Sequence, residues 1–175
     1  NSGTGFIPIG NSSTYFTGVY NGKGYEIDGL YVNRSNSSYQ ALFGYADGAS
    51  IDSLGVTNVN ITGDYYCAGL VGYCYNYTSI YKCYSTGSVS GENYAGGLVG
   101  YFLYYSYITN CYTTCSVTGD YYIGGLVAYK AYSSSVNKCY SVGSVSGNGN
   151  VGGLVGHSGS GSVTGSFWDT ETSGQ

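Results

Sequence analysis

The sequence predicts an all-β protein, a right-handed parallel β-solenoid of about six coils with a 28-residue repeat. Three observations predict this fold. One five-letter motif recurs at constant spacing, the segments between its copies are rich in β-branched, aromatic and turn-forming residues, and no stretch has helical periodicity. The right hand is expected from the general preference of crossovers between parallel strands.

The repeat is defined by the motif GGLVG, which stands at residues 96–100 and 152–156. Variants stand at 40–44 (QALFG), 68–72 (AGLVG) and 124–128 (GGLVA). Their leucines are separated by 28 residues at every step: Leu42, Leu70, Leu98, Leu126 and Leu154. The same step relates two further sets, which are Cys83, Cys111, Cys139 and Phe167, and Ile61, Val89, Val117 and Val145. The final unit departs from the step, because Val163 arrives one residue early.

Each unit is expected to hold two or three short strands joined by tight turns. Segments such as ITNCYTTCSVTG (108–119) carry β-branched and aromatic residues, and TGDYY (118–122) is typical of a turn. Helix is disfavoured because Gly is frequent, with 31 residues, while Ala and Leu are scarce. We divide the chain into an N-terminal flank with the first coil or coils (1–40), the 28-residue repeats (41–165) and a closing or capping segment (166–175).

Stacking of the units places equivalent side chains in columns about 4.8 Å apart. The Leu column and the Ile/Val column are expected to form the core. Aromatic residues form two further columns, whose rings would stack from coil to coil. One contains Tyr45, Tyr73, Tyr101 and Tyr129 with His157 in the last place, and the other contains Tyr84, Tyr112 and Tyr140 with Trp168 at its end.

Composition indicates an extracellular or cell-surface protein. Charged residues make up only 8% of the chain, against about 25% in typical soluble domains. With a net charge of −4 there is no basic stripe for nucleic acid, and no apolar run approaches the ~20 residues of a membrane span. Sequences for N-glycosylation begin at five asparagines, which would matter in an exported chain: Asn11, Asn33, Asn36, Asn60 and Asn76.

The segment YAGGLVGYFLYYSYITNCYTTCSVTGDYYIGGLVAY (94–129) resembles the GLUG-motif repeats of bacterial and archaeal surface proteins, including adhesins and repeat regions of IgA-cleaving peptidases. FIPIGNSSTYFTGVYNGKGYEIDGLYV (6–32) and SFWDTETSGQ (166–175) resemble the segments that precede and close such repeats. The resemblance implies an exported β-solenoid module. It transfers no catalytic residues, because in those peptidases the chemistry lies in a separate domain.

Six cysteines permit two interpretations. Cys83, Cys111 and Cys139 lie at bridging distance in the predicted column, but their parallel Cβ directions favour small buried thiols over disulfides. Three other cysteines fall outside that column and are better disulfide candidates, within or between molecules: Cys67, Cys74 and Cys115. No spacing of Cys and His supports zinc.

A column of turn residues, Asp64, Glu92 and Asp120, could share a calcium ion, although such residues also face water in ordinary turns. No cofactor is otherwise expected. The single histidine, His157, is more simply explained as the last member of a Tyr column than as a catalytic base. With Arg34 as the only arginine, no polar cluster suggests an enzyme.

The main hypothesis is therefore a non-enzymatic structural module of an extracellular fibre, whose copies associate end to end into a filament. A glycan-binding adhesin module is the first alternative, with Tyr73 and Tyr101 as expected sugar contacts. An ice-binding solenoid is the second. It is suggested by a face of hydroxyl-bearing residues around Ile61, Val89, Val117 and Val145 that includes Thr62 and Thr118.

Overall fold

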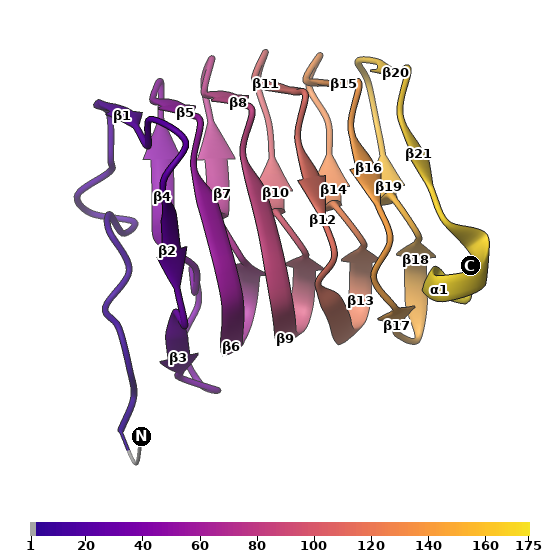
Figure 1. Ribbon diagram of the computed structural model, residues 1–175, viewed down its shortest axis with the longest axis horizontal. Helices are drawn as coiled ribbons and strands as arrows, with labels where there is room; N and C mark the ends of the chain where they lie inside the picture. The colour runs from indigo at the N-terminus through magenta and orange to yellow at the C-terminus, as the bar shows by residue number, and fades with distance from the viewer. Residues whose placement is uncertain (1–2) are drawn as a thin grey trace.

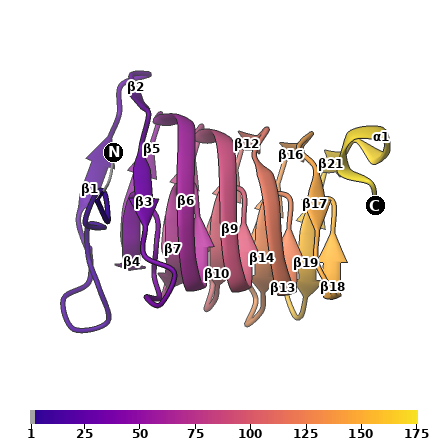
Figure 2. The same ribbon diagram turned by 90° about the horizontal axis from the view of Figure 1, so that it is seen from below.

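The computed structural model describes residues 3–175 and confirms a parallel β-solenoid with a repeat of about 28 residues. The coils stack along one axis, with the N-terminal flank at one end and the C-terminal segment at the other (Figure 1). Viewed from below, strands of successive coils, such as β6, β9 and β13, lie side by side along this axis (Figure 2). About five full turns are present, slightly fewer than the six expected from length.

Three parallel sheets make up the walls of the solenoid. The first contains six strands, β1 (Val19–Asn21), β5 (Ser50–Asp52), β8 (Ser79–Tyr81), β11 (Tyr107–Thr109), β15 (Ser135–Asn137) and β20 (Val163–Thr164). The second contains five strands, β4 (Phe43–Asp47), β7 (Val71–Tyr75), β10 (Val99–Phe102), β14 (Val127–Lys130) and β19 (Val155–Ser158).

The third sheet holds the longest strands. It contains ten strands, β2 (Glu26–Asp28), β3 (Tyr31–Asn33), β6 (Gly55–Ala68), β9 (Tyr84–Gly96), β12 (Tyr112–Thr113), β13 (Ser116–Gly124), β16 (Tyr140–Ser141), β17 (Val145–Ser146), β18 (Gly149–Gly152) and β21 (Phe167–Trp168). A short helix, α1 (Thr170–Ser173), follows the last strand. Each strand pairs with its equivalents in the neighbouring coils.

The core follows from strand alternation. In β9, Val89 is buried while Ser88 and Ser90 face solvent, and the same pattern recurs in β13 around Val117. The motif leucines contribute a second buried column, and all five are at most 4% exposed: Leu42, Leu70, Leu98, Leu126 and Leu154. One unit alone could not bury these side chains, so the stacking of coils creates the core.

The glycine at the second position of the four later motifs is required by the close approach of coils. A Cβ added at Gly69 would lie 2.6 Å from the carbonyl oxygen of Gly97, the equivalent residue one coil later. The main chains are already joined there by a hydrogen bond of 3.0 Å from the Gly69 N–H to that oxygen. Gly therefore recurs in the motif because a side chain would separate adjacent coils.

The corners of the coil use residues with left-handed backbone conformations. Equivalent corner residues share this conformation from coil to coil, as at Lys82, Asn110 and Lys138, with φ of 50°, 56° and 51°. Left-handed conformations cost non-glycine residues roughly 1–2 kcal/mol each. The regular hydrogen bonds between coils therefore have to hold each corner in place.

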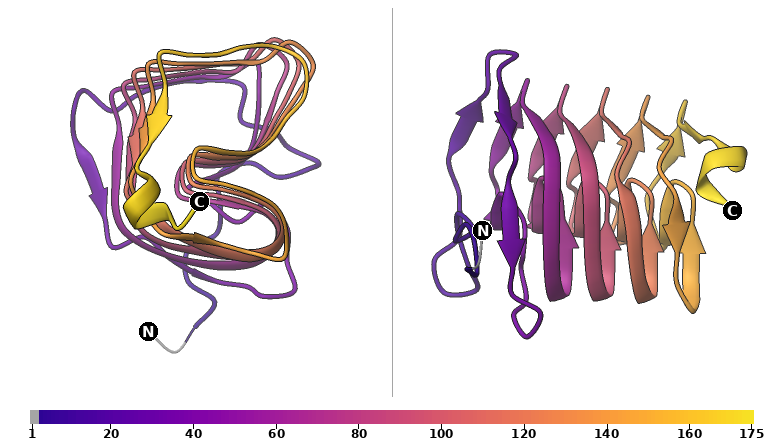
Figure 3. Two further views of the ribbon diagram at one scale, coloured as in Figure 1. Left: turned by 90° about the vertical axis from the view of Figure 1, so that its right-hand side faces the viewer. Right: turned by 60° about the horizontal axis from the view of Figure 1, so that its bottom comes forward.

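In end view the coils superimpose, and their outline is indented on one side (Figure 3, left). One side of the indentation is formed by the C-terminal end of β13 and its equivalents in the other coils. The other side is formed by β14 and its equivalents. Aromatic side chains from the two sides contact each other across it.

Candidate functional site

Tyrosine ladders are the main chemical feature of the surface. Tyr45, Tyr73, Tyr101 and Tyr129 stack with ring centroids 4.5–4.9 Å apart, and His157 stacks on Tyr129 at 4.7 Å with an interplanar angle of 13°. We call this column the Tyr45 ladder. His157 thus takes the place of a ring at the end of an aromatic column, as its spacing in the sequence indicated.

A second column, which was not predicted from the sequence, lies beside the first. The Tyr39 ladder consists of Tyr39, Tyr66, Tyr94 and Tyr122, whose successive rings stack at 5.1, 5.2 and 4.8 Å. All four residues have left-handed backbone conformations, with φ between 56° and 63°. The signal was present in the sequence, because three of these tyrosines close the turn segments at 62–66, 90–94 and 118–122.

The two ladders interlock edge to face. Tyr66 meets Tyr73 at 5.1 Å and 87°, and Tyr94 meets Tyr101 at 5.0 Å and 86°. Burial raises the pKa of Tyr45 to about 12 and also raises the pKa values of Tyr73 and Tyr101 above the ordinary value. Both faces of Tyr73 and of Tyr101 are covered by neighbouring rings, so these two residues do not offer free stacking platforms for a sugar.

The Tyr84 ladder runs along another wall and corrects one expectation. Tyr84, Tyr112 and Tyr140 stack within 3° of parallel, and the next ring is Phe167, 5.5 Å from Tyr140, rather than Trp168. The last coil is one residue shorter than the others, because Val136 pairs with Val163. The pairing of every later residue is therefore shifted by one position, so Phe167 pairs with Tyr140 and Trp168 pairs with Ser141. Phe167 consequently does not continue the Cys column. Ser166 takes that place instead, and its hydroxyl oxygen accepts a hydrogen bond from the Cys139 N–H.

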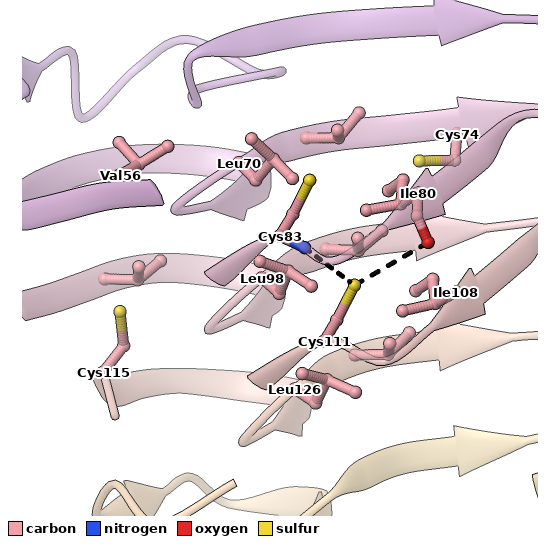
Figure 4. Packing of buried hydrophobic residues seen from close by; sticks show 14 of the residues in the cluster. Val56, Leu70, Cys74, Ile80, Cys83, Leu98, Ile108, Cys111, Cys115 and Leu126 are labelled. Carbon is pink, nitrogen blue, oxygen red and sulfur yellow. Dashed lines mark hydrogen bonds between the residues drawn. The ribbon is translucent and has the colours of Figure 1, made fainter. Parts of the chain in front are cut away.

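Cys83, Cys111 and Cys139 are buried free thiols in one column. The thiol of each contacts a carbonyl oxygen one coil earlier, as Cys111 does with Ile80 at 3.7 Å, and the Cys83 N–H donates to Cys111 Sγ at 3.3 Å (Figure 4). The thiols therefore link adjacent coils at a corner through hydrogen bonds.

The structure does not support disulfides at Cys67, Cys74 and Cys115. All three are free and fully buried. Cys67 is paired with Ala95 and Cys74 with Ala46 and Phe102, so their neighbours in the adjacent coils are not cysteines. Burial also keeps these thiols from reaching another molecule, and it raises the pKa of Cys67 to about 12.

The acidic column lies at the outer turns, with Asp64 and Asp120 half-buried and Glu92 exposed. Asp120 Oδ1 accepts a hydrogen bond of 2.6 Å from Asn148. Within residues 3–175, no three His, Cys, Asp or Glu side chains are grouped closely enough to hold a metal ion. Calcium binding at this column stays a prediction.

The five glycosylation sequences lie at accessible positions. Asn33, Asn36 and Asn60 are exposed and Asn76 is half-buried. Asn11 is exposed, but its Oδ1 accepts hydrogen bonds from the N–H groups of Ser13 and Thr14 and so stabilises a turn.

The hydroxyl-bearing face predicted from the sequence lies on β6, β9, β13 and β17. Two columns flank the buried Ile/Val column, one with Asn60 paired to Ser88 and the other with Thr62, Ser90 and Thr118 paired in register. Serine occupies several of these places, which limits the number of methyl groups that the face presents.

Comparisons with known proteins give little further identification. No known family and no solved structure matches this chain. A protein of Evansella cellulosilytica described as a Gly-rich membrane protein is 40% identical over 63 residues. This match covers 36% of the present chain and 7% of the relative, so the chain spans a small part of that protein's length. No helix within residues 3–175 is both long and apolar enough to cross a membrane.

Proposed function

We propose that the chain is a non-enzymatic structural module of an extracellular or cell-surface fibre, and that copies of it stack end to end. The observation that carries this proposal is the distribution of exposed apolar groups. Within residues 3–175, the exposed large apolar side chains other than Tyr all lie near the two ends of the rod: Phe6, Ile7, Ile9 and Val19 at one end, and Val163, Phe167 and Trp168 at the other. The walls between them expose tyrosines.

The two ends also present matching columns. At the N-terminal end, Ile9 pairs with Phe43 and so begins the column that Val155 ends, while Tyr20 begins the column that Val163 ends. The strands β19 and β20 each have a partner on one side only. A second copy placed about 4.8 Å beyond them would continue both sheets. Such a contact joins unlike surfaces, and repetition of it produces an open filament.

The C-terminal segment covers part of this end. Gln175 Nε2 donates to the carbonyl of Val145 at 3.1 Å, and Trp168 packs against the backbone of Gly153. The C-terminal segment therefore covers β17 and the motif at 152–156 near Gly153. The edges of β19 and β20 stay open. We therefore regard the tail from Asp169 to Gln175 as a partial cap that weakens association.

The extracellular setting is supported by the low charge of the chain, by the accessible glycosylation sequences and by the resemblance of residues 94–129 to GLUG repeats. The partial relative is described as a membrane protein, which agrees with a location at the cell surface. The structural role is supported by His157, since this histidine serves as an aromatic ring in the Tyr45 ladder.

Two single substitutions test the proposal. Val19 in β1 is 79% exposed and Phe167 in β21 is 60% exposed. Val19→Lys is designed to block the N-terminal end of the rod, and Phe167→Lys is designed to block the C-terminal end. Sedimentation and electron microscopy of the unmodified chain should show filaments that lengthen with concentration. Each variant alone should stay monomeric, while their mixture should form pairs through the remaining intact ends.

Tyr107→Lys, on a wall of the rod, is the matched control and should assemble normally. A monomeric wild-type chain at about 1 mM, a concentration at which even weak contacts are populated, would refute the proposal. So would normal filaments formed by both end variants.

A further inference from the structure

Two exposed tyrosines from adjacent coils stack at one corner of the rod. The corner between β7 and β8 carries Tyr77, and the next corner along the axis, between β10 and β11, carries Tyr105 (Figure 1). Their ring centroids are 5.4 Å apart, with an interplanar angle of 13°. Tyr77 is 62% exposed and Tyr105 is 48% exposed. Within residues 3–175, no other stacked pair of tyrosines has both members exposed.

The backbone of the two corners is fixed although the side chains are accessible. Tyr77 and Tyr105 have left-handed φ values of 55° and 56°. The Tyr77 N–H donates to the carbonyl of Tyr104 in the next coil at 2.9 Å. The residues that follow the pair, Thr78 and Ser106, are fully buried, and the Thr78 N–H donates to Ser106 Oγ at 3.2 Å. The two phenol rings are therefore held beside each other by hydrogen-bonded main chain.

Neighbouring phenols can be joined by oxidation. Removal of one electron and the hydroxyl proton converts a tyrosine to a radical whose unpaired electron is shared between the oxygen and the two ring carbons beside it. Two such radicals combine through these carbons, and the hydrogen on each joined carbon then moves to its phenol oxygen. The sum is a loss of two hydrogen atoms, which one molecule of hydrogen peroxide accepts to become two molecules of water.

The composition and the packing favour this pair over other groups. The chain has no methionine, and its six cysteines are buried, so the oxidisable side chains on the surface are chiefly tyrosines. The two joined carbons must move together by pivoting of the rings. Accessible rings can pivot, whereas Tyr66 and Tyr73 are held edge to face in close packing. Tyr104 and Tyr132 also stack, at 4.4 Å, but Tyr104 is half-buried and Tyr75 packs against it.

We propose that Tyr77 and Tyr105 are a modification site, at which hydrogen peroxide and a peroxidase join them as dityrosine. The bond would connect adjacent coils through residues 28 positions apart. Like a disulfide, such a link stabilises the fold by restricting the unfolded chain, and the six cysteines, all free thiols, supply no such link. The reaction uses two residues of one copy, so it does not depend on end-to-end assembly.

Treatment of the full chain with hydrogen peroxide and a peroxidase tests the proposal. At a protein concentration of about 10 µM, coupling within one copy should outpace coupling between copies. The product should show dityrosine fluorescence, run as a monomer on a denaturing gel and have lost two hydrogen atoms by mass. Trypsin should then release residues 35–82 linked to residues 83–130, with the link at Tyr77 and Tyr105 on fragmentation. The urea midpoint should rise by at least about 1 M.

Tyr77→Phe and Tyr105→Phe keep the ring but remove the hydroxyl, so each variant should fold and lose about tenfold of the linked peptide. Tyr81→Phe and Tyr107→Phe are the matched controls. These tyrosines are 37% and 46% exposed, but their partners in the neighbouring coils are not tyrosines, so the yield should not change. Circular dichroism confirms that each variant is folded. Absence of dityrosine, links between copies only, a predominant link at another pair, or an equal yield from Tyr77→Phe and wild type would overturn the proposal.

Discussion

Replacement of Gly69 by alanine should separate two coils of the solenoid. A Cβ at Gly69 would lie 2.6 Å from the Gly97 carbonyl oxygen and 2.7 Å from Ser85 Cβ, whereas ordinary contacts of this kind begin at 3.4 Å. Relief of the first contact alone requires a shift of 3.4 − 2.6 = 0.8 Å. The 3.0 Å bond from the Gly69 N–H to that oxygen would then stretch beyond the range of a hydrogen bond.

The first coil supports this reasoning, because it carries Ala41 where the later coils carry glycine. Among residues 3–175, neither the Ala41 nor the Leu42 N–H makes the main-chain bond to the next coil that Gly69 and Leu70 make. We therefore expect Gly69→Ala to lose two main-chain hydrogen bonds and some packing. The free energy of unfolding should fall by about 2–3 kcal/mol.

Urea unfolding followed by far-UV circular dichroism measures the change, with an expected fall in the midpoint of about 1 M. Gly3→Ala is the control, since a Cβ there has nothing within 4 Å and its φ is not left-handed. Gly29→Ala, which has open space but a φ of 70°, separates the backbone effect and should cost about 1 kcal/mol. A Gly69→Ala variant within about 0.5 kcal/mol of wild type would refute the stacking argument.

Three further predictions concern the tyrosines, the thiols and the tail. Because burial raises the folded-state pKa of Tyr45 to about 12, the folded chain holds this proton while the unfolded chain loses it. The free energy of unfolding should therefore fall as the pH rises from about 10 to 12. The tyrosinate absorbance of the folded chain should rise late in that range. If all tyrosines of the folded chain titrated at about pH 10, the burial of Tyr45 would be contradicted. The six buried thiols, Cys74 among them, should react with a thiol reagent only on unfolding, and rapid reaction of the native chain would be inconsistent with the structure. Deletion of residues 169–175 should strengthen end-to-end association in sedimentation; weaker association would show that the tail belongs to the contact rather than capping it.

The fold was predictable because each position of a coil repeats its neighbour's environment. The constant 28-residue step from Leu42 to Leu154 indicates stacking, since a solenoid is the simplest structure that places identical positions together. The last coil was less predictable. Counting in steps of 28 assigned Phe167 to the Cys column and Trp168 to the Tyr84 ladder, but one missing residue moved both.

The surface sites were harder to predict than the core. Spacing shows that two residues share a column, but it does not show whether two columns face each other across an indentation, as the Tyr39 and Tyr45 ladders do. The disulfide expectation failed for a related reason: irregular placement of Cys67 and Cys74 in the sequence says nothing about burial. The N-terminal flank around Arg34 lies outside the repeat, where the periodic pattern gives no guidance to its structure.

Each coil forms its sheet bonds only with the coil before it and the coil after it, through contacts that are nearly the same at every level. Removal or duplication of one complete unit therefore brings together two surfaces that already fit. A gene that encodes such an array can gain or lose whole units by recombination between its own copies. The length of the rod can therefore change by whole units while the contacts within the remaining coils stay the same.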